Sequence, residues 1–171
     1  MSLLPIITLP DPLLRTISKP VGKIDGTINR LIDDMLETMY KAPGLGLAAI
    51  QVAVPLRLVV LDVAEENEPR EPLVLINPEI VKLGDERAFH EEGCLSIPDV
   101  RYEIERPTTL IVRYTDRAGK SVERDASGLL ATAIQHEVDH LDGRMIIDFM
   151  SKLRRDMVIR KFKKIAREAG V

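Results

Sequence analysis

Hydrophobic side chains recur at every third or fourth position over residues 25–41, which is the spacing of one face of an α-helix. Asp25 is suited to cap the start of this helix, because its carboxylate can accept hydrogen bonds from the first free backbone N–H groups. Pro43, Gly44 and Gly46 follow and end the pattern. The pattern therefore predicts an N-terminal helix that runs into a glycine-containing loop.

The middle of the chain carries short runs of β-branched residues bounded by Pro, Gly, Asn and Asp, which is typical of strands. A polar-apolar alternation on both sides of Gly119 predicts a hairpin over residues 114–125. Because hairpins join antiparallel neighbours, we expect a mostly antiparallel arrangement. The predicted strands cover residues 56–63, 72–81, about 88–91 and 108–116.

Two more helices are predicted nearer the C-terminus. Ser127 and Gly143 are suited to begin and end a central helix with a broad apolar face. The last helix, at about residues 151–169, is amphipathic and basic, and the chain from Ser151 onward holds eight Lys or Arg against two Asp or Glu. No repeat or linker interrupts the chain. We therefore predict one domain over residues 1–171, of the α+β class, with mostly antiparallel β-sheets around the central helix.

The chain has 171 residues, of which 45% are hydrophobic, a net charge of −3 and one cysteine. The weakly acidic balance argues against nucleic acid as the main substrate, since phosphate-binding domains usually carry a basic excess. A single cysteine excludes an intramolecular disulfide and favours a reducing environment. The N-terminus lacks the basic start of a signal peptide, and no stretch reaches the roughly 18 apolar residues of a membrane span. We therefore expect a cytoplasmic protein.

The sequence QHEVDH at residues 135–140 places two histidines four positions apart on the central helix. His136 and His140 then lie one above the other on one face, where both can bind one ion, and Glu137 lies beside them. This is the HExxH pattern of metal-dependent hydrolases. The alternative is a pair of unrelated helical histidines next to an acid, and the chain's total of three histidines makes that coincidence the weaker interpretation.

A catalytic site of this type needs a third protein ligand beside an open position for water. In one hydrolase pattern this ligand lies six residues after the second histidine, but that position is Ile146, which has no lone pair. Asp156 and Glu168 have suitable carboxylates, although both lie among basic residues on the terminal helix, where surface ion pairs are the more common fate. These two acids are the weaker candidates.

Upstream, Cys94 and His90 lie in the sequence FHEEGCLSIPD. Cys94 follows two acids and a glycine, whereas a buried structural cysteine usually stands in an apolar run. A thiolate binds zinc or iron strongly, so we favour Cys94 as the third ligand and keep His90 as the alternative. Glu137 could then take a proton from a water whose pKa the ion lowers to roughly 7 and pass it to a departing nitrogen. These parts predict metal-assisted hydrolysis of an amide.

Three motifs in this chain resemble, in order and spacing, those of the peptide deformylase family, whose enzymes remove the formyl group from the N-terminal methionine of newly made bacterial proteins. No motif position departs from the family pattern, and the resemblance spans nearly the whole chain. The motifs are GxGxAAxQ at Gly44, Gly46, Ala48, Ala49 and Gln51; EGCLS at Glu92, Gly93, Cys94, Leu95 and Ser96; and QHExDH at Gln135, His136, Glu137, Asp139 and His140.

The resemblance implies one divalent ion, most often Fe²⁺ in the cell, with Zn²⁺, Ni²⁺ or Co²⁺ able to replace it. It implies Glu137 as the general acid and base. It also implies that the side-chain amide of Gln51 and the backbone N–H of Leu95 stabilise the developing oxyanion. The implied metal ligands are Cys94, His136 and His140.

For the substrate, N-formylmethionyl nascent peptides, the resemblance implies that the backbone at Gly44 and Gly46 pairs with an extended peptide like an added strand. Glu92 is implied to stabilise the site, paired with Arg106, and Arg101 to lie near the entrance. Core packing and solvated charges are the alternative roles for these side chains. The full set of implied substrate positions is Gly44, Leu45, Gly46, Glu92, Leu95, Arg101, Leu129 and Thr132.

Two further hypotheses concern partners and competing functions. The basic face of the C-terminal helix offers a surface for ribosomal RNA, and the alternative is a helix packed on its own domain with a solvated basic face. We expect a monomer that does not bind membranes. Two other functions stay open: a different zinc hydrolase that uses Asp156 or Glu168, and a metal-binding module without catalysis, which would tolerate loss of Glu137.

Overall fold

The computed structural model describes residues 2–170 and contains three α-helices within that range. Helix α1 (Gly26–Lys41) begins where the Asp25 carboxylate accepts the backbone N–H of Ile28 at 3.1 Å. Helix α2 (Gly128–Leu141) is the predicted central helix, and α3 (Lys152–Glu168) is the basic terminal one. Three short 3-10 helices connect larger elements: η1 (Pro12–Arg15), η2 (Ala49–Val52) and η3 (Ile146–Phe149).

The strands form a five-stranded sheet and a separate two-stranded ribbon, and all pairs of strands are antiparallel. The sheet has the order β1-β2-β3-β6-β7, and the ribbon is β4-β5. The α+β class and the antiparallel pairing predicted from the sequence are therefore confirmed. The strands are β1 (Gly46–Ala48), β2 (Leu58–Leu61), β3 (Leu73–Leu83), β4 (Arg87–Cys94), β5 (Ile97–Pro107), β6 (Thr109–Thr115) and β7 (Ser121–Ser127).

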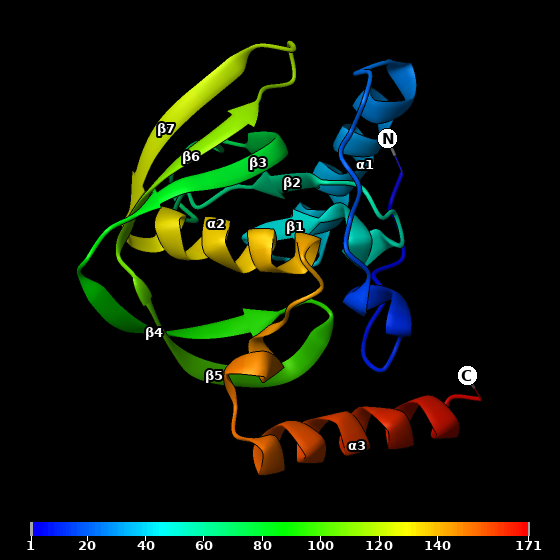
Figure 1. Cartoon of the computed structure of the whole chain (residues 1–171). Coiled ribbons are helices and arrows are strands. Elements are labelled where there is room, and N and C mark those ends of the chain that lie inside the picture. Colours follow the sequence, from blue (N-terminus) through cyan, green and yellow to red (C-terminus); the bar gives the residue numbers. More distant parts are fainter. Residues whose placement is uncertain (1, 171) are drawn as a thin grey trace.

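Helix α2 lies between the sheet and the β4-β5 ribbon, as Figure 1 shows. Most of the helix is buried: every residue from Ala131 to Val138 is buried, and so are His140 and Leu141. Its upper side packs into the sheet through a cluster that includes Ile134 and Leu75. Because the helix is covered on both faces, its polar side chains are held in a water-poor interior between the two layers.

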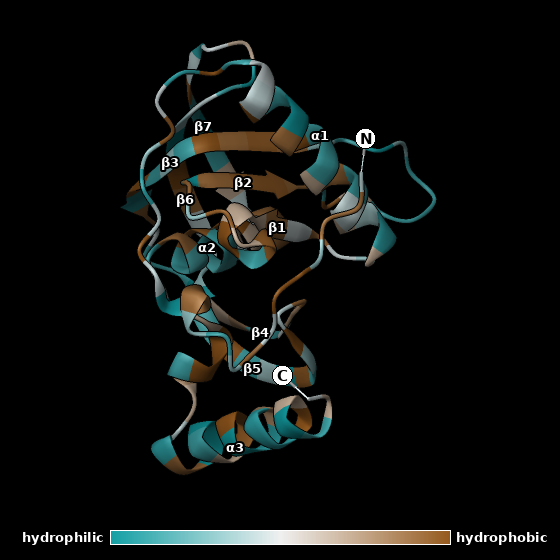
Figure 2. Ribbon diagram, turned by 90° about the vertical axis from the view of Figure 1, so that its right-hand side faces the viewer, coloured by the Kyte–Doolittle hydropathy of each residue, from teal (hydrophilic) through white to brown (hydrophobic). Residues whose placement is uncertain are grey.

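Helix α3 lies beyond the ribbon, away from the sheet (Figure 1). Phe162 is its one buried residue and joins a cluster with Ile104 and Met150, whereas Leu153 and Met157 are exposed. In Figure 2 its ribbon alternates between hydrophilic and hydrophobic colours, while β2 is uniformly hydrophobic. Over residues 2–170, no helix combines the length and apolar character needed to cross a bilayer.

Two strands differ from the sequence-based expectation. The glycine loop after α1 contains β1, because Gly46 pairs with Leu61 at the edge of the sheet. The segment after Cys94, which is not among the predicted strands, contains β5, which begins at Ile97 and pairs with β4. A proline is tolerated there because it stands second in a ribbon that has a free edge.

Candidate metal centre

Cys94, His136 and His140 place three metal-ligating atoms within 4.8 Å of one another, the one such group found within residues 2–170. Cys94 ends β4, and its Sγ lies 3.3 Å from Nε2 of His140. The two imidazoles are one turn apart on α2, with ring centroids separated by 5.0 Å. The ribbon and the helix thus bring together two segments more than 40 residues apart in the chain.

The donor set fits a divalent ion. Two atoms at ordinary Zn–S and Zn–N distances from one tetrahedral ion are about 3.5 Å apart, close to the separation of Cys94 and His140. Burial lowers the pKa of His140 well below its usual value, so its nitrogen lone pair is free to bind. Burial also acts to lower the pKa of His136, but Glu137, Cys94 and Glu92 outweigh it and raise that pKa well above its usual value. The surroundings therefore favour positive charge at this point.

Glu137 has the properties of a general base. Its side chain is buried, and burial raises its pKa to about 7. One oxygen, Oε2, lies 3.9 Å from Nε2 of His136. The other, Oε1, is buried and has no hydrogen-bond partner among the described residues. A carboxylate with a pKa near neutrality and a free buried oxygen is suited to exchange a proton with water or substrate.

Gln51 is held in a fixed orientation beside the cysteine. Its Oε1 accepts the backbone N–H of Ala48 at 2.9 Å. Its Nε2 donates to Oγ of Ser96 at 3.1 Å and lies 3.7 Å from Sγ of Cys94. The amide nitrogen therefore faces the centre of the site, where a donor could reach a developing oxyanion.

Leu95 lies in the turn between β4 and β5, next to the glycine motif. A Cβ at position 44 would lie 2.8 Å from Cδ1 of Leu95, and a Cβ at position 46 would lie 2.7 Å from Oε2 of Glu137. A side chain at either position would therefore displace a residue of the site. The three motifs meet at one place in the fold.

A buried ion-pair network lies behind His136. Glu92 accepts hydrogen bonds from Nε of Arg106 at 2.6 Å and from Nη2 at 3.0 Å, and its Oε1 lies 3.0 Å from Nδ1 of His136. Asp139 accepts a third bond from Arg106 at 3.0 Å. Burial acts to raise the pKa of Glu92, but the bonds from His136 and Arg106 lower it below its usual value. The ionised Glu92 can therefore hold Nδ1–H of His136 and direct Nε2 toward an ion.

Comparison with known proteins places this architecture in one family. The family model for polypeptide deformylase matches residues 3–156. The peptide deformylase of Rhizobium meliloti (strain 1021) is 59% identical over 170 residues, which cover 99% of this chain and 98% of that protein. This chain belongs to the polypeptide deformylase family.

The solved structures agree with this assignment. The crystal structure of peptide deformylase from Ehrlichia chaffeensis superposes with a TM-score of 0.92 and 41% identity. The match covers 99% of this chain and 100% of the E. chaffeensis chain. The structure of the E. chaffeensis enzyme in complex with actinonin has a TM-score of 0.92 and 44% identity, over 98% of this chain and 99% of that one. Deformylases are metal-dependent hydrolases that remove the N-formyl group from nascent peptides, and this chain is one of them.

The alternative ligands of this deformylase lie elsewhere. His90 is exposed on β4, and Glu168 is exposed at the end of α3. Asp156 is half-buried on α3. Within the described residues, none of these three joins the Cys94 group. A zinc hydrolase that uses a carboxylate from α3 is therefore not the arrangement found here.

The substrate positions implied by the family pattern are spread around the centre. Thr132 is buried one turn before His136 on the same face of α2, and Leu129, half-exposed, lies one turn further away. Leu45, which adjoins β1, is also half-exposed. Arg101 is exposed on β5 and pairs with Glu91 at 2.6 Å. Glu92 differs from these positions, because its carboxylate oxygens bond to Arg106 and His136. This arrangement suits Glu92 to orient a metal ligand.

One contact has no counterpart in the sequence-based interpretation. Ser96, quoted within a motif but given no role, is fully buried and fixes the Gln51 amide. The sequence alone allows Asp139 either to orient a metal ligand or the helix, or to face solvent. In the structure it accepts a hydrogen bond from Arg106 at 3.0 Å, which places it in the network behind His136. The pairing of Glu92 with Arg106, which the family resemblance implies, is present in the structure.

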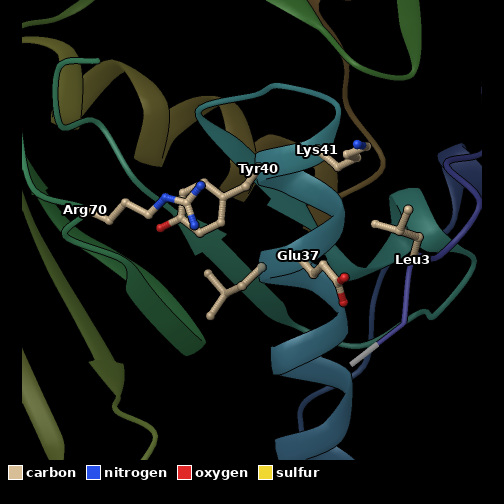
Figure 3. A pocket seen from close by; sticks show the side chains of 6 residues that line it. Leu3, Glu37, Tyr40, Lys41 and Arg70 are labelled. Carbon is tan, nitrogen blue, oxygen red and sulfur yellow. The ribbon is translucent and has the colours of Figure 1, made fainter. Parts of the chain in front are cut away.

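A hollow beside α1, shown in Figure 3, has none of the proposed metal ligands in its lining. Tyr40, one of its lining residues, donates to Asp62 at 2.6 Å, and the guanidinium of Arg70, another lining residue, lies 4.0 Å from the centre of the Tyr40 ring. Burial, reinforced by Asp62, raises the pKa of Tyr40 to about 12. The tyrosine is therefore a fixed hydrogen-bond donor, and we assign no chemistry to this hollow.

Proposed function

We propose that this deformylase acts on N-formylmethionyl nascent peptides and releases formate, with one divalent ion held by Cys94, His136 and His140. The observation that supports this most strongly is the buried Glu137 carboxylate, which lies against the sulfur and nitrogen cluster with one oxygen unpaired. A divalent ion bound there supplies Lewis acidity, which acidifies water and polarises a carbonyl.

Glu137 carries out both proton transfers of the reaction. Its carboxylate takes a proton from the water that attacks the formyl carbon, and a new C–O bond forms as the carbonyl oxygen becomes negative. Glu137 then gives this proton to the methionine nitrogen as the C–N bond breaks. The products are formate and a free amino terminus. A pKa of about 7 allows the same group to accept and to donate near neutral pH.

The oxyanion is stabilised by Gln51 and by the backbone N–H of Leu95. The Gln51 amide is already fixed by Ala48 and Ser96, so little reorganisation is needed when charge develops. β1 is an edge strand of the sheet, and Gly44 and Gly46 carry no side chain before and at its start, which lets an extended peptide pair with it. The pocket for the methionine side chain is assigned to Leu45, Leu95, Leu129 and Thr132.

We infer that the ion is Fe²⁺ in the cell, with Zn²⁺, Ni²⁺ and Co²⁺ able to replace it, since one thiolate and two imidazoles suit all four. An iron centre with an accessible thiolate is expected to lose activity in air. Chelation followed by reloading with Ni²⁺ or Co²⁺ should restore it. Elemental analysis of protein purified without oxygen identifies the native ion, and a zinc content of one per chain would contradict the iron assignment.

The decisive test is formate release from formyl-Met-Ala-Ser. Glu137→Ala should abolish release while the metal stays bound, because Glu137 is not a ligand. Cys94→Ser should weaken metal binding. Cleavage of an internal peptide bond, or full activity in Glu137→Ala, would overturn the proposal. Actinonin, which is bound in the E. chaffeensis structure, is expected to inhibit the reaction.

The setting of the reaction is also a proposal. We place the enzyme in the cytoplasm as a monomer, with the basic face of α3 as a surface for ribosomal RNA, since α3 buries only Phe162 and carries an excess of Lys and Arg. Deletion of residues 151–171 should abolish co-sedimentation with ribosomes, and binding of the full chain should weaken as salt rises. Unchanged binding after deletion would exclude α3 as the docking surface.

A further inference from the structure

We propose that Phe149 is a positioning residue for the metal ligand His136. Its ring covers the guanidinium of Arg106 and keeps water away from the ion pair that orients the imidazole. The inference rests on the proposed function of the centre. Phe149 ends η3 and lies outside the three deformylase motifs.

The chain of contacts runs from the ring to the ligand in three steps. The centre of the Phe149 ring lies 4.7 Å from Cζ of Arg106. Arg106 donates two hydrogen bonds to Glu92, and Glu92 Oε1 lies 3.0 Å from Nδ1 of His136. Each of these contacts is direct. A movement of the guanidinium therefore passes to the imidazole through a single carboxylate.

The ring stands at the boundary between this network and solvent. An open groove runs beside it, lined in part by Arg106, Asp139, Arg144 and Phe149. The side chains of Arg106 and Glu92 are only 6% and 5% exposed, whereas Phe149 is 44% exposed. Phe149 is therefore exposed to solvent, while the ion pair behind it is buried. Without the ring, the groove would extend onto the face of the guanidinium.

Water in that position would weaken the orientation of His136. A charge pair interacts far more strongly in a dry interior than next to water, and water would compete for the N–H groups of Arg106. Glu92 would then be free to leave Nδ1 of His136, and the imidazole would lose the bond that fixes its tautomer and direction. An aromatic face suits this position because it attracts the cation while it excludes solvent.

The test compares Phe149→Ala with Phe89→Ala in the metal-loaded enzyme. Phe89 is a matched control, since it is 60% exposed on the neighbouring strand β4 and is not stacked on any cation among the described residues. Metal affinity is measured by competition with a chromogenic chelator, and kcat and KM with formyl-Met-Ala-Ser. We expect Phe149→Ala to weaken metal affinity about tenfold and to lower kcat with KM unchanged, the low end of the effect of groups that orient metal ligands. Phe149→Tyr and Phe89→Ala should match the original enzyme.

A double-mutant cycle with Arg106→Lys decides whether Phe149 acts through Arg106. If it does, Phe149→Ala has little further effect on metal affinity once Arg106 is replaced, whereas multiplying effects would overturn the inference. Should Phe149→Ala fail to fold, Phe149→Leu takes its place in each comparison, and unchanged metal affinity in that variant also overturns it. Failure of the proposed function would be visible separately, because the unmodified enzyme would then bind metal but release no formate.

Discussion

At the scale of single residues, the candidate metal centre depends on the lack of a side chain at position 46. The Glu137 carboxylate occupies the space where a side chain there would begin, and Cδ2 of Leu61 closes the other side at 2.8 Å. A contact of 2.7 Å between a Cβ and Oε2 cannot persist, so any side chain at position 46 must move the carboxylate. The lack of a side chain at position 46 therefore leaves room for the carboxylate of the proposed general base.

Gly46→Ala is expected to lower kcat by roughly 10²-fold, the low end of what a positioned general acid–base group contributes. Steady-state kinetics with formyl-Met-Ala-Ser measure this. Leu61→Val removes Cδ2 and so relieves the second clash. The double variant Gly46→Ala with Leu61→Val should therefore remain impaired. Full recovery in the double variant would show that Leu61, and not Glu137, is the group displaced.

At the scale of elements, the end of α2 is fixed by a second glycine. Gly143 has a φ of +74°, and a Cβ there would lie 2.5 Å from the backbone oxygen of Arg15. That oxygen cannot move without η1, so the helix end and the N-terminal segment meet at this point. The guanidinium of Arg15 also donates to the carbonyl of Gly143 at 3.1 Å. The segment that carries His140 is thereby tied to η1.

Gly143→Ala should destabilise the fold by more than the roughly 1–3 kcal/mol of a strained backbone alone, because the backbone clash adds to it. Gly119→Ala is the matched control: its φ of +88° is equally left-handed, but a Cβ there meets nothing within 4 Å. Chemical denaturation of both variants measures the difference. Equal losses of stability would mean that the contact with Arg15 is unimportant.

The ion pair between Arg15 and Asp148 at the same junction predicts that the stability of the fold depends on pH. Burial acts to raise the pKa of Asp148, but hydrogen bonds from Arg15 and from the N–H of Met145 lower it below its usual value. A carboxylate with a lowered pKa stabilises the folded state above its unfolded pKa of about 3.9, and this contribution disappears as pH falls through the folded pKa. Asp148→Asn should therefore be less stable than the original protein at pH 7, with the difference narrowing as pH falls below about 4. Urea unfolding at several pH values tests this, and a constant difference down to pH 2 would contradict it.

At the scale of the whole molecule, the proposed ion joins two layers. Cys94 belongs to the β4-β5 ribbon, whereas both histidines belong to α2, which packs under the sheet. An ion bound to all three closes a long loop of chain and binds the folded state alone. Metal binding should therefore stabilise the folded arrangement of ribbon and helix.

Removal of the ion with a chelator is expected to lower the Tm, and Ni²⁺ or Co²⁺ should restore it. With free metal at 1,000 times Kd, the gain in unfolding free energy is about 4 kcal/mol. Thermal unfolding measures the shift, and Cys94→Ser should lose most of it. A Tm that is independent of metal would be incompatible with ligands from both layers binding one ion.

The local sequence pattern determined much of the secondary structure, because the spacing of apolar residues within one segment encodes a helix or a strand. The four-residue interval between His136 and His140 requires one helical face, and Asp25 marks the start of α1 where the structure has it. The alternation of residues 97–107 was also present, yet it was hidden by Pro98 and by charged residues that face solvent from a two-stranded ribbon. The sequence therefore predicted helices and strands where the spacing of apolar residues was regular.

Contacts between segments were decided only by the tertiary structure, because spacing along a chain does not say which faces meet. Enclosure of α2 between sheet and ribbon brings Cys94 to the histidines and buries Glu137, which raises its pKa. The same packing places Phe149 over Arg106, a contact for which neither residue carries a local signal. The sequence therefore determined the type of chemistry, and burial between the layers determined the environment in which that chemistry takes place.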